Sequence, residues 1–332
     1  MKILVVGGAG YIGSHMVDLL VRKGCKVVVL DDLSGGHRDA VRNAELVVES
    51  LADRKRLNRL FGSHKFDAVM HFASFIEVGR SVRDPAAFYR NNLVNTLNLL
   101  EEMVANNVLR FVFSSTAAIF GEPQVTPIDE QHPKLPINPY GQSKLMVEEI
   151  LRDYEKAYGL DSVCLRYFNA AGADSRAGLG ERHDPETHLI PLILQAASGR
   201  RESVSIFGND YDTPDGTCIR DYIHVMDLCA AHFLAMRRLI SGKGGGRYNL
   251  GNGHGYSVQQ VIDAAREVTG MDIKVSMEPR RAGDPARLVA DSTLARTELG
   301  WKPERAELKR IIADAWSWEQ SRNRAAPTKL AA

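Results

Sequence analysis

Two residues in the middle of the chain have the types and spacing needed for proton transfer. Tyr140 and Lys144 are four positions apart in a segment that follows Asn138-Pro139, a pair typical of a helix start. Both side chains would then lie on one face of the helix. A lysine ammonium near a phenol favours the phenolate, which brings the tyrosine into the range of acid–base catalysis near neutral pH. The same spacing occurs by chance in many helices, so the pair alone could also be a surface pair.

Three hydroxyl side chains end an apolar segment about 25 residues before Tyr140. Ser114, Ser115 and Thr116 directly follow Phe113, at the expected carboxyl end of a strand. A hydroxyl group in that position could hydrogen-bond a substrate alcohol. The combination therefore predicts a site in which a tyrosine base and a strand-end hydroxyl act on the same alcohol.

A glycine-rich segment near the N-terminus indicates a dinucleotide site. The sequence GGAGYIG at residues 7–13 directly follows an apolar run and satisfies the G-x-G-x-x-G pattern. Its glycines permit a tight turn, let the backbone approach a pyrophosphate and direct a helix N-terminus at it. A bare glycine turn is the alternative, but the acidic Asp31 follows Gly13 by eighteen residues, as this fold requires.

Asp31 and its neighbour Asp32 favour NAD as the dinucleotide. A carboxylate after the second strand accepts hydrogen bonds from the adenosine ribose hydroxyls and repels a 2′-phosphate. Two alternatives stay open. The acids could form a solvated turn, and Arg38 is near enough in the sequence to keep NADP possible.

These groups need a scaffold, and the first half of the chain predicts one. Short β-branched runs alternate with helix-length periodic segments, which is the pattern of βαβ units and a parallel sheet. The expected helices include one of roughly twenty residues that opens at Asp84-Pro85 and one at residues 140–158. The expected strands are residues 3–6, 26–30, 46–49, 68–71, 110–114 and 162–166. The predicted fold class is α/β, with a doubly wound, parallel Rossmann-type sheet.

The second half is less regular and predicts a smaller C-terminal α/β substrate lobe. Its pattern gives helices near residues 189–198 and 227–240 and short strands at residues 204–206 and 247–250. We expect residues 1–170 to form the NAD-binding domain, with return segments from the second half, and residues 171–330 to form a UDP-sugar-binding lobe. Such a lobe would cap the carboxyl ends of the strands, where ligands of these sheets bind.

Composition excludes several classes of protein. The 332 residues carry 42 Lys and Arg against 41 Asp and Glu, so the net charge of +1 attracts neither nucleic acid nor anionic membranes in general. The four cysteines form no C-x-x-C pair, which favours reduced structural thiols. No apolar segment is long enough for a membrane span or a signal peptide. We expect a cytoplasmic protein without a metal ion, a nucleic-acid partner or a membrane partner.

The three motifs together resemble the short-chain dehydrogenase/reductase superfamily in order and spacing. Further segments resemble its extended branch, and in particular the UDP-glucose 4-epimerase family, from end to end. They include LRYFN at residues 165–169, PRRAGD at residues 279–284 and, most specifically, residues 208–227. This resemblance implies NAD as the cofactor, a UDP-sugar as the substrate and a homodimer formed by the two long helices near residues 85–106 and 140–158.

The resemblance also assigns site residues. The implied catalytic residues are Thr116, Tyr140 and Lys144. The residues expected to contact NAD are Gly7, Gly10, Tyr11, Ile12, Gly13, Asp31, Asp32, Phe72, Ala73, Asn92, Ser114, Tyr140, Lys144 and Tyr167. The residues expected to contact the UDP-sugar are Thr116, Asn169, His188, Leu189, Ser205, Phe207, Arg220, Arg281 and Asp284.

The implied reaction inverts the 4-hydroxyl of a UDP-hexose, UDP-glucose or UDP-galactose, through a 4-keto intermediate with Tyr140 as base. Related enzymes remain alternatives, namely a UDP-N-acetylglucosamine 4-epimerase, a 4,6-dehydratase or a net dehydrogenase. Ala117-Ala118 follow Thr116 where a dehydratase needs an acid–base pair, and Leu288 stands where some family members have a bulky tyrosine beside the sugar. A non-catalytic dinucleotide sensor is the rival from another class.

Overall fold

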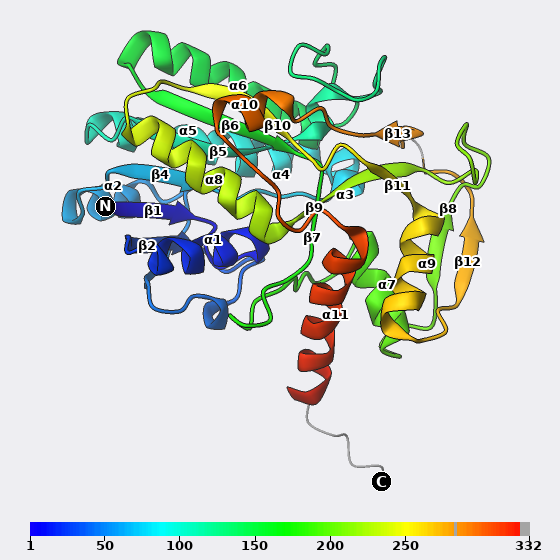
Figure 1. Ribbon diagram of the computed structural model, residues 1–332. Coiled ribbons are helices and arrows are strands. Elements are labelled where there is room, and N and C mark those ends of the chain that lie inside the picture. The colour runs from blue at the N-terminus through cyan, green and yellow to red at the C-terminus, as the bar shows by residue number, and fades with distance from the viewer. Residues whose placement is uncertain (282–283, 326–332) are drawn as a thin grey trace.

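The computed structural model describes residues 1–281 and 284–325, and a seven-stranded parallel sheet forms its centre (Figure 1). All pairings within this sheet are parallel. The strands, in sheet order, are β10 (Gly246–Leu250), β6 (Asp161–Tyr167), β5 (Arg110–Thr116), β4 (Ala68–His71), β1 (Lys2–Val6), β2 (Lys26–Asp31) and β3 (Glu45–Val48). This order confirms the predicted doubly wound fold.

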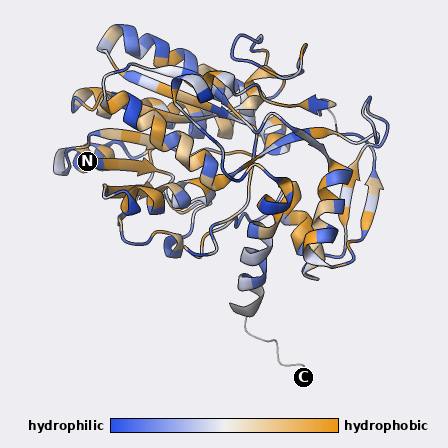
Figure 2. Ribbon diagram, viewed as in Figure 1, coloured by the Kyte–Doolittle hydropathy of each residue, from blue (hydrophilic) through white to orange (hydrophobic). Residues whose placement is uncertain are grey.

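Helices cover both faces of the sheet and bury its β-branched strands in two separate cores. One core joins the sheet to α1 (Tyr11–Arg22), α8 (Val225–Ile240) and α10 (Thr293–Glu298). The other joins it to α2 (Arg54–Ser63), α5 (Asn95–Ala105) and α6 (Pro139–Tyr158). Figure 2 shows the central strands largely in hydrophobic colours, as expected for strands buried on both faces.

The six predicted strands are all present, with small shifts that matter for the site. Asp31 is the last residue of β2, and Thr116 is the last residue of β5, so both side chains are fixed by strand geometry. Two elements expected in the second half, the strand at residues 247–250 and the helix at residues 227–240, are return segments. They are β10 and α8, which complete the central sheet and one of its faces.

The long helix predicted from Pro85 is interrupted. It consists of α4 (Pro85–Phe88), a π-helical segment η2 (Tyr89–Val94) and α5. Asn92 lies inside the π segment, and such segments often mark functional sites in helices. Three other short helices, which the sequence pattern did not indicate, are η1 (Arg38–Ala40), α3 (Val78–Arg83) and η3 (Ala117–Phe120).

A smaller lobe lies beside the carboxyl ends of the central strands (Figure 1). Helices α7 (Leu189–Ala197), α9 (Val258–Thr269) and α11 (Leu308–Ala325) share its core. One sheet contains β7 (Asn169–Ala171), β9 (Ile219–His224), β11 (Gly255–Ser257) and β13 (Arg287–Leu288), and a second pairs β8 (Val204–Phe207) with β12 (Val275–Glu278). The last residues assigned to this lobe from the sequence, 326–330, lie outside the described part of the chain.

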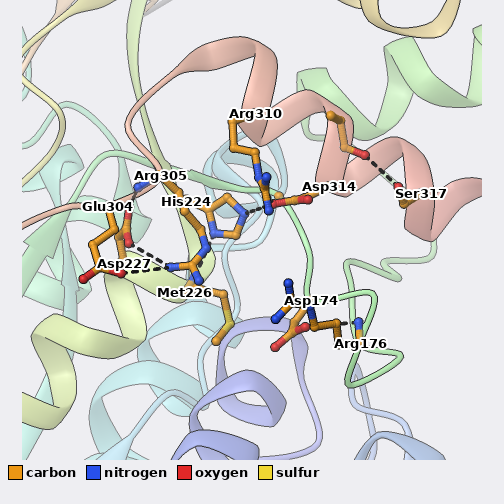
Figure 3. A network of polar contacts seen from close by, with 12 residues as sticks. Asp174, Arg176, His224, Met226, Asp227, Glu304, Arg305, Arg310, Asp314 and Ser317 are labelled. Atoms are coloured by element: carbon orange, nitrogen blue, oxygen red, sulfur yellow. Dashed lines mark hydrogen bonds and ion pairs between the residues drawn. The ribbon is translucent and has the colours of Figure 1, made fainter.

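A polar network ties α11 to the segment between β9 and α8 (Figure 3). The Nε2 atom of buried His224 lies 3.2 Å from Oδ2 of Asp314, which also accepts a 2.8 Å bond from Arg310. One residue into α8, the Asp227 carboxylate accepts the backbone N–H of Arg305 at 2.7 Å. Because α8 also packs on the central sheet, this network links the lobe rigidly to the scaffold of the nucleotide site.

Candidate active site

Helix α6 places Tyr140 and Lys144 in its first two turns. The Asn138 side chain caps the helix by accepting the Gly141 N–H at 2.9 Å, and Pro139 occupies the first helical position. Tyr140 is 9% exposed and Lys144 is 3% exposed, so the pair is buried and is no surface pair. A Cβ atom on Gly141 would lie 2.5 Å from the Ala118 carbonyl oxygen, so only glycine lets α6 approach the end of β5 this closely.

Thr116 meets Tyr140 at that contact. The Thr116 hydroxyl oxygen accepts the Ala118 N–H at 3.1 Å and shares a hydrogen bond with the Tyr140 phenol. Burial raises the pKa of Tyr140 above its usual value, and the bond to Thr116 acts in the opposite direction. The sequence predicted a phenolate near neutral pH, whereas the protein groups alone favour the neutral phenol. A nearby positive charge is therefore needed to activate this base.

Lys144 is the nearest candidate for that charge, but its own burial opposes ionisation. Its Nζ donates a 2.9 Å hydrogen bond to the Ser114 carbonyl oxygen and lies 4.8 Å from the centre of the Phe113 ring. Burial lowers the pKa of Lys144 to about 7, although Glu148 one turn further along α6 acts to raise it. Lys144 therefore changes charge near neutral pH, as a group that tunes proton transfer should.

Glu148 belongs to a buried ion pair that supports the same strand end. Its carboxylate accepts a 2.6 Å bond from the Ser115 hydroxyl and paired bonds from Arg166, the shortest at 2.6 Å. Both charged side chains are nearly inaccessible, with exposed fractions of 6% for Arg166 and 4% for Glu148. This pair fixes α6 against β5 and β6, and sequence reasoning did not identify it because neither residue stands in a motif.

Ser114 does not face the site through a free hydroxyl. Its Oγ lies 2.9 Å from Nε2 of His232 in α8, whose Nδ1 lies 2.9 Å from the Leu228 carbonyl oxygen. The Ser114 side chain also hydrogen-bonds Tyr167, while burial raises the pKa of that phenol. Ser114 therefore links Tyr167 to α8, and His232 is a positioning residue that the sequence pattern did not reveal.

The glycine segment forms a cradle at the N-terminus of α1. A Cβ on Gly13 would overlap the Gly7 carbonyl oxygen, and one on Gly7 would overlap the Ala73 backbone, so both positions need glycine for close packing. Gly10 is the N-cap, and no side chain caps the helix. The backbone donors of the first turn, at Tyr11, Ile12 and Gly13, are thus suited to a pyrophosphate.

Asp31 holds this cradle in place. Its carboxylate accepts the Ala9 N–H from the glycine segment and the Leu33 N–H from the following turn, both at 2.9 Å. Burial raises the pKa of Asp31, and these two bonds counteract it. Asp32 is exposed and accepts the Ser34 N–H at 2.9 Å. The backbone donors at one end and a buried carboxylate at the other fit a dinucleotide with free ribose hydroxyls.

We predict that the purified protein carries NAD and not NADP. The buried Asp31 carboxylate would lie against a 2′-phosphate, and two like charges so close are strongly unfavourable. Mass spectrometry of the nucleotide released by denaturation measures this directly. Recovery of NADP would show that Asp31 serves the glycine segment alone.

The other residues expected at the cofactor lie around this cradle. Phe72 and Ala73 follow β4, and the Phe72 ring packs 4.8 Å from His232. The Asn92 amide is fully used: it exchanges hydrogen bonds with the Phe75 backbone and donates to the Ser143 hydroxyl at 3.1 Å. Asn92 thereby joins the π segment to α6. The Tyr11 hydroxyl donates to the Gly172 carbonyl at 2.7 Å and leaves its backbone N–H for a ligand.

Most of the residues expected at the UDP-sugar gather in the smaller lobe. Arg220 donates to Asp284 at 3.3 Å and to the Pro285 carbonyl at 2.8 Å, and Arg281 stacks 3.7 Å above the Phe207 ring. Leu288 lies opposite Arg220 in the β9–β13 pairing and packs on a cluster that contains Ala117. Two guanidinium groups from the lobe thus belong to the same face as the end of β5.

Three expected substrate residues have protein partners instead. The Asn169 amide donates to the Asp221 carbonyl at 3.1 Å, and the Ser205 hydroxyl lies 3.0 Å from that of Ser276. His188 precedes Leu189 at the start of α7, and its Nδ1 lies 2.6 Å from Glu181. Together with His183 and Glu186, these residues form a cluster that the sequence analysis did not predict.

Comparison with known proteins agrees with this geometry. A family model described as GDP-mannose 4,6 dehydratase matches residues 4–314. A UDP-glucose 4-epimerase of Halalkalibacterium halodurans is 50% identical over 320 residues, which cover 96% of each chain. The chain belongs to the UDP-glucose 4-epimerase family.

Solved epimerase structures share the fold in full. The UDP-glucose 4-epimerase from Brucella ovis, in complex with NAD, is 47% identical with a TM-score of 0.93, over 95% of this chain and 97% of that one. The UDP-Glc/GlcNAc 4-epimerase from Campylobacter jejuni is 45% identical with a TM-score of 0.84, over 96% and 99%. Membership of the epimerase family also accounts for the dehydratase-named family model, since Ala117 and Ala118 cannot act as acid and base.

None of the helices in residues 1–281 and 284–325 combines the length and the hydrophobicity that crossing a lipid bilayer requires. The four cysteines are all free and buried. This agrees with the structural role predicted for the thiols.

Proposed function

We propose that the protein is an NAD-dependent isomerase that inverts the 4-hydroxyl of UDP-glucose and UDP-galactose. The observation that carries the proposal is the contact among Thr116, Tyr140 and Lys144 at the end of β5, next to a cradle suited to a dinucleotide. Relatives at about 50% identity over nearly the whole chain are named for this activity.

In the proposed mechanism, Tyr140 takes the proton of the sugar 4-hydroxyl and later returns it. Thr116 orients that hydroxyl and the phenol through its own hydroxyl, and Lys144 supplies positive charge near the phenol. NAD, held by the α1 N-terminus and Asp31, supplies a reversible hydride acceptor, so the net redox change is zero. The 4-keto sugar stays tethered through its diphosphate, for which Arg220 and Arg281 are suited, and is reduced again on its other face.

The direct test is incubation of the purified protein with UDP-galactose and no added cofactor. Formation of UDP-glucose, resolved by chromatography, supports the proposal. A 4-keto-6-deoxy product would instead identify a dehydratase, and free NADH accumulating with a keto sugar would identify a net dehydrogenase. Absence of any turnover by NAD-loaded protein would favour the sensing module.

Replacing Thr116 with valine is expected to slow epimerisation by about 10- to 100-fold, because a lost hydrogen bond to a buried partner costs about 1–3 kcal/mol. The loss should fall mainly on kcat, since the hydroxyl orients reacting groups. Thr116→Ser, which keeps the hydroxyl, is the matched control and should retain most of the activity. Equal losses in the serine and valine variants would show that the methyl group of Thr116, and not its hydroxyl, is what the site needs.

Leu288 provides a prediction about the range of substrates. It is a branched aliphatic side chain where some family members have a tyrosine, so it should leave room for the 2-acetamido group of UDP-N-acetylglucosamine. The variant Leu288→Tyr should lower kcat/KM for the acetylated sugar about tenfold or more relative to UDP-glucose. Leu288→Met, which conserves the volume, should leave the ratio unchanged. The same ratio in wild type and Leu288→Tyr would exclude Leu288 as the gate.

We further propose a cytoplasmic homodimer that pairs the long helices near residues 85–106 and 140–158. In support, exposed apolar side chains occur on and beside these helices, at Val82, Val94 and Tyr158. Light scattering during size-exclusion chromatography measures the oligomeric state.

A further inference from the structure

Four metal-ligating side chains converge in the loop between β7 and α7. Glu181, His183, Glu186 and His188 follow one another with the spacing E-x-H-x-x-E-x-H, and one ligand atom from each lies within 4.8 Å of all the others. The proposed reaction requires only His188 from this group. The other three residues therefore need a separate explanation.

The distances between the ligand atoms suit a single small cation. Nδ1 of His188 lies 2.6 Å from Oε1 of Glu181 and 3.5 Å from Oε1 of Glu186. Nδ1 of His183 lies 3.1 Å and 3.7 Å from the same two oxygens. Ligands at about 2.0–2.1 Å from a tetrahedral zinc ion are about 3.3 Å apart, which lies within this range.

His183 supplies an independent indication. Its Nδ1 atom is buried and, among the residues that the structure describes, has no hydrogen-bond partner of suitable geometry, although two carboxylates are near. Buried polar atoms are seldom left unpaired in native proteins, and an unmodelled ion is one of the usual reasons. This nitrogen points to a ligand shared with the carboxylates.

The surroundings hold the cluster in place without neutralising it. The Glu181 carbonyl accepts the Trp318 indole N–H from α11 at 3.0 Å, and the His183 ring packs edge-on against Tyr11 in α1. The Glu186 carboxylate accepts the backbone N–H groups of residues 187 and 188. Of the nearby arginines, Arg182 pairs with Asp39 and Arg200 pairs with Glu319, so both turn to other partners.

We propose that Glu181, His183, Glu186 and His188 bind one divalent transition-metal ion, with Zn²⁺ as the best fit. Two imidazole nitrogens and two carboxylate oxygens match the ligands of zinc, and the two carboxylates balance its charge. Magnesium and calcium favour sites made of oxygen atoms alone. The ion would join the loop at residues 181–188 to α1 and α11. It takes no part in the redox chemistry of the proposed function.

The alternative is a cluster held by protons, in which charged imidazoles pair with the two carboxylates. Metal binding separates the two. Untagged, NAD-loaded full-length protein is dialysed against a chelator, and Zn²⁺ is then titrated by calorimetry. We expect about one Zn²⁺ per chain, and a rise in Tm on addition of Zn²⁺ because the ion binds only the folded state.

The critical variant is His183→Asn, because His183 is outside the proposed catalytic and substrate residues. It should weaken Zn²⁺ binding about tenfold or more and abolish the rise in Tm. His254→Asn removes an exposed histidine elsewhere and should behave like wild type. Co²⁺ used in place of Zn²⁺ should give the absorption of a tetrahedral site with nitrogen and oxygen ligands, without thiolate bands.

Wild-type protein that binds no Zn²⁺ would overturn the proposal in favour of the proton-held cluster. Equal binding by wild type and His183→Asn would also overturn it, by placing the ion elsewhere. An equal Tm of the metal-free wild type and variant shows that the variant folds. Since none of these measurements uses the epimerase assay, failure of the metal proposal and failure of the proposed function remain distinguishable.

Discussion

Replacing Tyr140 with phenylalanine is expected to lower the rate of epimerisation by about two or more orders of magnitude, the range of a lost general acid–base group. Phenylalanine keeps the ring that fills the buried space between α6 and the end of β5. It lacks the hydroxyl that Thr116 contacts and that would take the sugar proton. The loss should therefore appear in kcat, with NAD content and Tm close to those of wild type.

The matched control is Tyr158→Phe, which makes the same chemical change at an exposed position at the other end of α6. It should leave the rate unchanged. Chromatographic assay of UDP-galactose conversion, with NAD content measured on the same samples, compares the variants. If Tyr140→Phe retained activity within a few-fold of wild type, the proton would have to pass through another group.

Replacing Lys144 with methionine is expected to have two opposite effects. Activity should fall by about two or more orders of magnitude, because the positive charge that favours the Tyr140 phenolate is lost. The free energy of unfolding at neutral pH should rise, because burial of Lys144 lowers its pKa to about 7 and a charged lysine is costly there. Methionine of similar length removes that cost.

The dependence on pH follows from the sign of the Lys144 shift. Its folded-state pKa, about 7, is below the usual value of 10.5, so the unfolded chain binds more protons between these values. The wild type should therefore gain stability relative to Lys144→Met as pH rises, by about 2 kcal/mol between about pH 7 and about pH 9. Below about pH 7 the difference should be constant.

Urea unfolding of both proteins after removal of the nucleotide, at several pH values, measures this difference. Lys156→Met, an exposed lysine in the last turn of α6, is the control and should show no such trend. A difference between wild type and Lys144→Met that does not change with pH would mean that Lys144 is solvated in solution.

The sequence predicted the scaffold well where local signals are strong. Each central strand is a run of β-branched residues, and GGAGYIG stands directly between β1 and α1. The roles of α8 and β10 are different, because nothing in their own residues says which sheet they join. Their places depend on packing against residues that are far away in the sequence. The short strands β7, β11 and β13, of two or three residues, are below the length at which periodicity carries information.

The site shows the same limit. Motifs located Tyr140, Lys144 and Asp31, but they could not show that burial opposes the ionisation of the first two. Burial is a property of the packed structure and not of spacing. The positioning residues Glu148, Arg166 and His232 were missed because single polar residues in helices and strands resemble surface positions until their partners are known. The cluster around His183 was present in one octapeptide, yet only the loop conformation turns its alternating side chains to one point.

The return of α8 and β10 to the central sheet has a consequence for synthesis of the chain. When residue 170 has left the ribosome, the face of the sheet that α8 covers is still open, and β6 is an unpaired edge. The nascent chain must then extend by about eighty residues before β10 can pair. Until that point an apolar surface and a free strand edge are available to other nascent chains. Premature termination near the boundary between the two halves should thus yield an aggregation-prone fragment that depends on chaperones, and not a small independent nucleotide-binding protein.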